Sequence, residues 1–266
     1  MAALIYIKRL ISPNRNYQKI KHVVIDEAQD LGEFNFIVLK ETLPSATFSI
    51  FGDLAQSIYD YRGISSWQDI NSLIFNNQGK IINFNKSYRT TSEIMSVADD
   101  VAQSISLGKS DLVVRHGNPV EFTYSFDDDE KIKHIINKIY EFKNKGYKTI
   151  AIISKTNEMS KTINEELAKR GLIIPNVSIN DDLTDDKYCI CTISNQLAKG
   201  LEFDAVIIND ANEEIYSVNS SLDMKLLYVA ITRALHEIDI VYTKKLTEPL
   251  LMNKFNDKKK LNLSKK

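Results

Sequence analysis

The sequence is poor in cysteine, glycine and proline, and it carries almost no net charge. Its 266 residues include two cysteines, nine glycines and five prolines, and the formal net charge is −1. Two cysteines are too few for a disulfide framework. A charge near zero excludes a protein coated in basic residues, so any nucleic-acid contact must come from a local groove. No apolar run approaches the roughly 20 residues that a membrane helix needs, so we expect no membrane partner.

The composition otherwise resembles that of an ordinary globular protein, with 43% hydrophobic and 26% charged residues. Cys189 and Cys191 alternate within an apolar run, and in a strand they would point to opposite faces. We interpret them as small core residues, and reduced thiols suit the cytoplasm. Lys8 and Arg9 follow the apolar N-terminal stretch rather than precede it, which is the wrong charge order for a signal peptide.

Short apolar runs alternate with helical patterns along the chain. Strands are expected over 22–25, 47–51, 80–84, 120–124, 149–154, 188–193, 205–209 and 237–242, and helices over 4–11, 92–107, 128–145, 157–170 and 221–235. This alternation predicts an α/β fold with parallel sheets flanked by helices. A break near residue 85 predicts two units, 1–85 and 86–250, the first of them incomplete. The lysine-rich segment 251–266 is expected to be a flexible basic tail.

Two adjacent carboxylates, Asp26 and Glu27, close the first apolar run. Carboxylates at the end of a buried strand are costly unless they have cationic partners. Asp26 suits Mg²⁺, which prefers hard oxygen ligands and retains water. Glu27 could then orient and deprotonate an attacking water. The alternative is that both acids only cap the helix that follows.

The second apolar run ends at Gly52 and leads into aromatic residues beside an arginine, namely Tyr59, Tyr61 and Arg62. Bases of a single nucleic-acid strand commonly stack on tyrosine rings and guanidinium planes. Half-buried core tyrosines would give the same pattern, so both interpretations stay open for these residues.

Five blocks, taken in order, resemble motifs II to VI of the UvrD/Rep-type helicases of superfamily one. They are 26–30 (Asp-Glu-Ala-Gln-Asp), 52–63 (Gly-Asp-Leu-Ala-Gln-Ser-Ile-Tyr-Asp-Tyr-Arg-Gly), 87–91 (Ser-Tyr-Arg-Thr-Thr), 192–203, which ends in Ala-Lys-Gly-Leu-Glu-Phe, and 226–234 (Leu-Leu-Tyr-Val-Ala-Ile-Thr-Arg-Ala). The resemblance implies P-loop NTPase (RecA-like) units, the first truncated and the second complete, that use ATP and Mg²⁺ on single-stranded DNA.

Roles in the first unit and along the DNA path follow from the same resemblance. It implies that Asp26 binds Mg²⁺, that Glu27 is the catalytic base, and that Gln56 senses the γ-phosphate. It further implies that the single strand lies on Tyr59, Tyr61, Arg62 and Lys199.

In the second unit, the resemblance implies nucleotide-binding roles for Tyr88 on the adenine, Glu202 on the ribose and the turn at Gly200. Arg89 and Arg233 are expected to reach the γ-phosphate across a cleft that faces the acid pair. Arginines there would stabilise the charge that spreads over the transferring phosphoryl group. The alternative for Arg233 is a structural ion pair on a mostly apolar helix.

A phosphate-binding loop of the form Gly-x-x-x-x-Gly-Lys-Ser/Thr is expected upstream of Asp26, yet no glycine occurs before that residue. The sequence Gly108-Lys109-Ser110 lies between the fourth and fifth motifs, and Gln103 stands where the first glycine should be. We therefore expect little ATPase activity from this polypeptide alone and a partner, a missing N-terminal motor segment, that supplies the loop.

Two other interpretations remain. The wording of 61–67 and 197–204 is similar to the helicase IV/HelD branch, some of whose members act on RNA polymerase, so a polymerase-docking module is one alternative. The short span of about 100 residues between the fourth and fifth motifs leaves no room for a large inserted domain, which weakens a claim of duplex unwinding. A degenerate remnant that only folds is the third interpretation.

Overall fold

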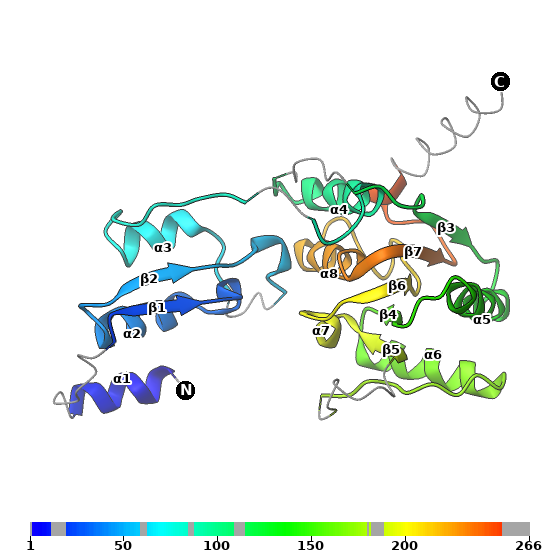
Figure 1. Cartoon of the computed structure of the whole chain (residues 1–266), viewed down its shortest axis with the longest axis horizontal. Coiled ribbons are helices and arrows are strands. Elements are labelled where there is room, and N and C mark those ends of the chain that lie inside the picture. Colours follow the sequence, from blue (N-terminus) through cyan, green and yellow to red (C-terminus); the bar gives the residue numbers. More distant parts are fainter. Residues whose placement is uncertain are drawn as a thin grey trace, which may run out of the picture. The chain divides into compact units, whose positions relative to one another are not determined.

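The computed structural model describes residues 2–11, 20–58, 63–84, 88–108, 115–179, 181 and 189–251 (Figure 1). The chain divides into two compact units, Met1–Phe84 and Asn85–Lys266. Both contain parallel strands flanked by helices, as the sequence predicts. Among the described residues, no helix has the length and apolar character required to cross a membrane.

Unit 1 is built on a pair of parallel strands. Its elements are α1 (Ala2–Ile11), β1 (His22–Ile25), η2 (Ala28–Asp30), α2 (Glu33–Thr42), β2 (Thr47–Ile50), η3 (Leu54–Gln56) and α3 (Trp67–Leu73). Residues 22–25 pair in register with residues 47–50. The small core gathers Ala28, Phe36, Ile64 and Ile70, with Trp67 packed against it.

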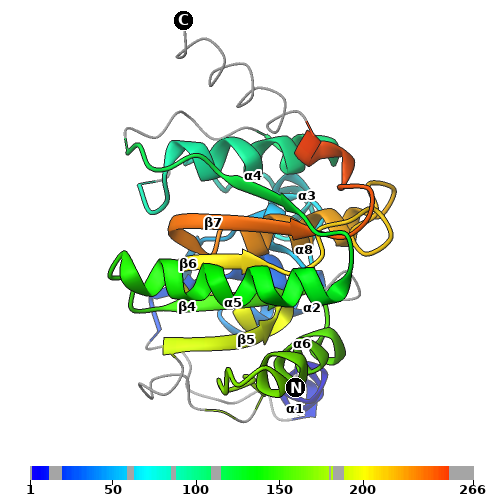
Figure 2. The same cartoon turned by 90° about the vertical axis from the view of Figure 1, so that its right-hand side faces the viewer.

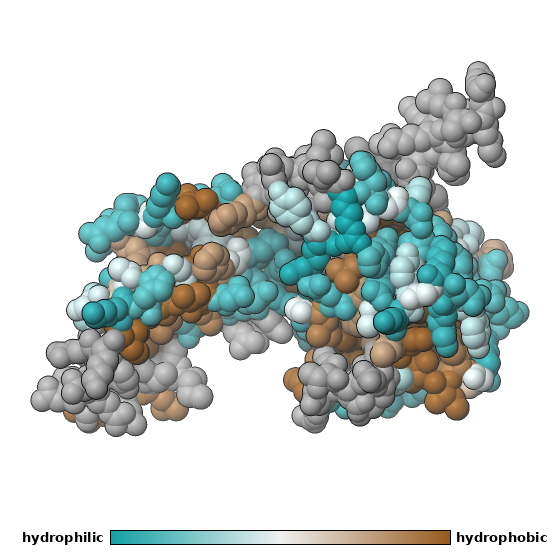
Figure 3. Space-filling model, in the orientation of Figure 1, coloured by the Kyte–Doolittle hydropathy of each residue, from teal (hydrophilic) through white to brown (hydrophobic). Residues whose placement is uncertain are grey.

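Two expectations for unit 1 are wrong. The run 80–84 forms no strand and all of its residues are exposed, because no neighbouring strand pairs with it in the described part of the chain. The strands β1 and β2 are also not buried, since Val24 is 65% exposed and Phe51, directly after β2, is 47% exposed. Figure 3 accordingly shows apolar residues among the polar ones on the visible face of unit 1.

Unit 2 holds a sheet of five strands in the order β3-β7-β6-β4-β5, with every neighbouring pair parallel. Its strands are β3 (Glu121–Tyr124), β4 (Ile150–Ser154), β5 (Ile190–Ser194), β6 (Phe203–Ile208) and β7 (Ala234–Tyr242). Its helices are α4 (Ser92–Ser104), α5 (Asp128–Asn144), α6 (Asn157–Lys169), α7 (Asn195–Ala198) and α8 (Ser221–Ile231). The last helix ends earlier, and the last strand begins earlier, than the sequence predicts.

Helices cover both faces of this sheet, so its central strands are buried. Figure 2 shows α5 and α6 in front of the sheet and α8 behind it. Every residue of β4 is buried, which explains its continuous apolar sequence. Cys191 lies in this core as predicted, and burial raises the pKa of its thiol to about 12, so it is not a reactive thiolate.

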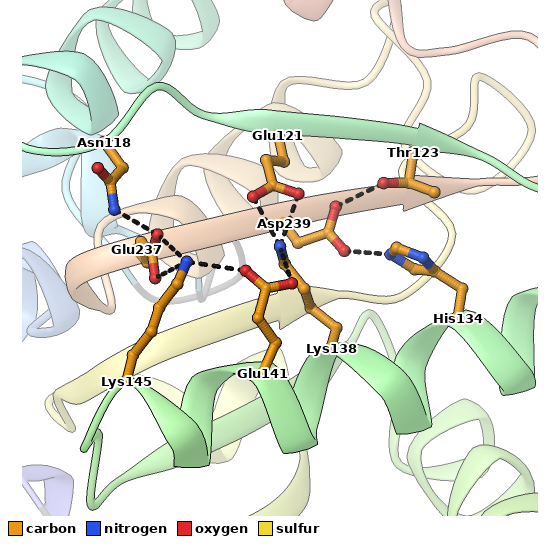
Figure 4. Close-up of polar contacts among 9 residues, drawn as sticks. All are labelled: Asn118, Glu121, Thr123, His134, Lys138, Glu141, Lys145, Glu237 and Asp239. Atoms are coloured by element: carbon orange, nitrogen blue, oxygen red, sulfur yellow. Dashed lines mark hydrogen bonds and ion pairs between the residues drawn. The ribbon is translucent and has the colours of Figure 1, made fainter.

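Part of the interface between α5 and the sheet is ionic rather than apolar (Figure 4). Asp239 of β7 is fully buried, and it accepts a hydrogen bond from Thr123 Oγ1 at 2.9 Å and faces His134 Nε2 at 2.5 Å. This bond raises the pKa of His134 above its ordinary value of 6.5, although partial burial opposes the shift. Lys138 is 3% exposed and donates to Glu121 at 2.6 Å. A buried cation and a buried anion are therefore each paired, as their desolvation requires.

The ionic layer continues to the start of β7 through Lys145. Its ammonium contacts Glu237 at 2.7 Å and Glu141 at 2.8 Å, and Glu237 also accepts from Asn118 Nδ2 at 2.5 Å (Figure 4). The layer thus ties α5, β7 and the segment before β3 to one another.

Candidate functional site

The acid pair of unit 1 lies where β1 and β2 end side by side. Backbone pairing continues past the strands, because Phe51 N–H donates to Ile25 O at 2.8 Å and Ala28 N–H donates to Phe51 O at 2.9 Å. This brings the turn after β1 against the turn after β2. Asp26 and Glu27 are both exposed there, and Glu27 has a φ of 51°, a left-handed conformation that is uncommon for a residue with a side chain.

A buried glutamine connects these two turns. Gln29 is 0% exposed, and its Nε2 donates to Glu27 Oε2 at 2.5 Å while its Oε1 accepts the N–H of Asp53 at 3.1 Å. Sequence reasoning assigned no role to Gln29. The sequence did contain one sign of this role, a lone amide inside the acidic block 26–30. If such an amide is buried beside a carboxylate, both of its polar atoms need hydrogen-bond partners.

The connection extends to Gln56. The Asp53 carboxylate accepts hydrogen bonds from Gln56 Nε2 at 2.9 Å and from Ala55 N–H at 2.9 Å. The second of these bonds caps the start of η3. A chain of side-chain and backbone hydrogen bonds therefore runs from Glu27 through Gln29 and Asp53 to Gln56. We call this chain the Glu27–Gln56 relay.

Gly52 permits the close approach on which the relay depends. A Cβ added there would lie 2.5 Å from Gln29 Oε1, 3.0 Å from Gln29 N and 2.9 Å from Trp67 Cζ2. Real Cβ atoms essentially never come within 3.0 Å of a neighbour, so only glycine fits without displacing Gln29 or Trp67.

The acid pair is suited to bind a magnesium ion, but the described residues around it do not form a complete set of protein ligands. Asp26 Oδ1 accepts the N–H of Glu27 at 2.9 Å, and its exposed carboxylate stands at the end of the strand. Among the described residues, no group of three or more histidine, cysteine, aspartate or glutamate side chains is arranged to hold a metal. A single carboxylate suits Mg²⁺, which usually keeps several waters and takes its other ligands from substrate phosphates.

In unit 2, two of the predicted nucleotide-site residues meet directly. Arg89 Nε lies 2.8 Å from Glu202 Oε1, with the side chains 57% and 37% exposed. Glu202 precedes β6, so it stands at the amino end of the sheet, and the contact with Glu202 places the Arg89 side chain there too. Tyr88 is 71% exposed, which leaves its ring available to a planar partner.

Arg233 occupies a different environment, since it is 2% exposed. Its Nε donates to Val229 O at 3.1 Å and its Nη1 donates to Leu201 O at 3.2 Å. The next residue is tied to the Arg89 segment, because Thr90 Oγ1 donates to Ala234 O at 2.7 Å. Arg233 would have to exchange its carbonyl contacts to reach a phosphate.

The remaining predicted residues are divided between described and undescribed parts of the chain. Lys199 is half-buried in the turn after α7, and Gly200 has a φ of +81° with open space around its Cα, so the turn itself favours glycine. Tyr59, Tyr61 and Arg62 lie outside the described residues, and so do Lys109 and Ser110.

Comparison with protein families gives two matches. The UvrD-like helicase C-terminal domain matches residues 82–183 and 173–245, and the UvrD/REP helicase N-terminal domain matches residues 10–73. Together these matches include every motif block named above.

Individual relatives are distant and much longer than the chain. DNA helicase II of Haemophilus influenzae is 25% identical over 62% of this chain and 23% of its own length, and the helicase PcrA of Bacillus subtilis is 28% identical over 58% and 22%. A probable DNA helicase of Mycoplasma pneumoniae is 26% identical over 82% of this chain and 42% of its own length. The chain thus spans less than half of these relatives.

One solved structure supports the fold of the C-terminal part. The C-terminal domain of a possible DNA helicase from a Lactobacillus species is 26% identical, with a TM-score of 0.50 over 62% of this chain and 92% of that chain.

Proposed function

The chain belongs to the UvrD/Rep helicase family, and on that premise we propose that it is the C-terminal ATPase and translocase portion of an ATP-dependent motor that moves on single-stranded DNA. The observation that carries the proposal is the Glu27–Gln56 relay, which connects the acid pair to the next motif. A motor needs such a physical connection, because the state of the nucleotide must alter the grip on the strand.

In unit 1, Glu27 is the general base that takes a proton from the attacking water. The hydrogen bond from buried Gln29 fixes the direction of its carboxylate. Asp26 would hold Mg²⁺, which when bound would neutralise negative charge on the phosphates of ATP. Gln56 responds to the γ-phosphate and transmits its presence through Asp53.

In unit 2, Arg89 and Arg233 stabilise the charge on a transferring phosphoryl group. The pairing of Arg89 with Glu202 supports this role, since an exposed arginine held by one carboxylate can exchange it for a phosphate at little cost. Tyr88 stacks on the adenine, and Glu202 and Gly200 bind the rest of the nucleoside. Buried Arg233 joins only after its contacts rearrange.

In this proposal the DNA strand is bound by Tyr59, Tyr61, Arg62 and Lys199. For these four residues the proposal is based on the sequence motifs. Fluorescence anisotropy with a labelled single strand at low salt tests it. We expect binding that Tyr61→Ala weakens and that survives removal of 252–266. Absence of binding at low salt would contradict the proposal, and retention of RNA polymerase in a pull-down would favour the polymerase-docking alternative.

ATP hydrolysis by this polypeptide alone should be slight, because its sequence contains no Gly-x-x-x-x-Gly-Lys-Ser/Thr pattern. A loop of that pattern binds the phosphates of ATP. A steady-state ATPase assay with single-stranded DNA tests this. Robust turnover that Glu27→Gln abolishes would refute the requirement for an added phosphate loop while leaving the motor assignment in place.

A further inference from the structure

A short segment outside all five motif blocks packs against the residues around Arg89. We call this segment, residues 115–118, the strap. Gly117 N–H donates to Glu93 Oε2 at 2.8 Å, and a Cβ added at Gly117 would lie 2.4 Å from Thr91 Cγ2. The strap therefore lies in direct contact with the turn that leads into α4.

The strap is also fixed to the start of β7 at two points. Arg115 Nη1 donates to the carbonyl of Arg89 at 2.7 Å, while Arg115 Nη2 donates to Nδ1 of His236. Asn118 Nδ2 donates to Glu237 Oε1 at 2.5 Å, at one end of the ionic layer (Figure 4). A single guanidinium thus joins the backbone of Arg89 to β7.

This arrangement requires one form of the His236 ring. A guanidinium only donates, so this contact requires a lone pair on Nδ1 and corresponds to the ring form with its proton on Nε2. Nε2 lies 3.8 Å from Asp204 Oδ1, which favours a proton on that nitrogen. The ring stacks on Tyr147 with centroids 5.7 Å apart and planes at 5°, and this contact holds it in the plane that Arg115 meets.

We propose that Arg115 is a positioning residue for Arg89, acting through the neutral Nδ1 of His236. Because Arg115 binds the Arg89 backbone, the Arg89 side chain stays on the Glu202 side, where the proposed function has it contact phosphate. The role of this positioning in catalysis rests on the proposed function. The contacts of Arg115 with Arg89 and His236 do not depend on a bound nucleotide.

Side-chain NMR on the whole chain tests the pairing. The protein has four histidines, so the His236 nitrogens can be assigned with one variant, His236→Phe. We expect an unprotonated Nδ1 that accepts a hydrogen bond, and a slowly exchanging Nε–H signal from Arg89 bound to Glu202. Arg115→Gln should shift the Nδ1 signal and weaken the Arg89 signal.

The matched control is Arg170→Gln, which removes the same charge from an arginine that pairs with Glu166 and Asp129. It should leave both signals unchanged. His236→Phe keeps a ring to stack on Tyr147 but has no acceptor, so it should behave like Arg115→Gln, whereas His236→Asn offers an acceptor oxygen and should retain the Arg89 signal. A ring protonated on Nδ1, or an Arg89 signal indifferent to Arg115→Gln, would overturn the inference.

The functional consequence is measured in any preparation that shows Glu27-dependent ATP hydrolysis. Arg115→Gln should lower kcat by about 10- to 100-fold with little change in KM, because a small misplacement of Arg89 weakens mainly the transition-state contact. Unchanged kcat would refute positioning while the proposed function stands. ATP hydrolysis that Glu27→Gln leaves intact would refute the proposed function, and the NMR signals would still decide the pairing.

Discussion

Replacing Gly52 with alanine tests whether the turns after β1 and β2 are as close as described. The added Cβ would lie 2.5 Å from Gln29 Oε1 and 2.9 Å from Trp67 Cζ2, so one of these groups must move. Overpacking of this kind costs about 1–3 kcal/mol. Displacement of Gln29 would also weaken its hydrogen bond to a carboxylate, a bond worth about 1.5–3 kcal/mol. The two costs overlap, so we expect a loss of about 2–4 kcal/mol in the free energy of unfolding of unit 1.

Trp67 makes the assay specific to unit 1. It is the only tryptophan in the protein, and it packs against the unit 1 core, so its fluorescence during urea unfolding reports on that unit. Gly79→Ala is the control, because a Cβ there meets only the side chain of Asn71, and it should cost under about 1 kcal/mol. If Gly52→Ala unfolds at the same urea concentration as the wild type, the close packing around Gln29 is refuted.

Two further substitutions probe buried polar groups. Gln29→Glu keeps the shape of the side chain but sets a second carboxylate against that of Glu27, so we expect a loss of about 2–3 kcal/mol by Trp67 fluorescence that acidification partly restores; a neutral effect would count against the relay. His134 has a raised pKa in the folded state, because Asp239 accepts its hydrogen bond. Its contribution is therefore complete below the ordinary value of 6.5 and is lost as the pH rises through the raised value. The stability difference between wild type and His134→Asn, from circular dichroism in urea, should shrink with rising pH, and growth with pH would contradict this assignment.

The sequence predicts the sheet of unit 2 well, because strands buried between helices have continuous apolar runs such as 150–154. It fails at 80–84, where a similar run finds no neighbouring strand in the described part of unit 1. An apolar run indicates only that the segment could form a buried strand. Whether a partner strand lies beside it depends on the rest of the fold, which the local pattern does not contain.

For the site, the motif blocks identify the residues that carry charge but not those that hold them in place. Asp26 and Glu27 are evident as an acid pair after an apolar run. Gln29 takes its importance from complete burial, and Arg115 takes its importance from contacts with residues far away in sequence. The burial of Arg233 also depends on tertiary structure, since the carbonyl of Leu201, far away in sequence, receives one of its donors.

We propose that the divalent cation of a bound nucleotide lies at Asp26, beside the start of the Glu27–Gln56 relay. Mn²⁺ can replace Mg²⁺ with a non-hydrolysable ATP analogue, and its unpaired electrons broaden NMR signals of nearby groups. We expect broadening of the side-chain amide signal of Gln29, which donates to Glu27, and Asp26→Asn should remove this broadening. Nucleotide binding that leaves the Gln29 signal sharp, or broadening that persists in Asp26→Asn, would refute this site.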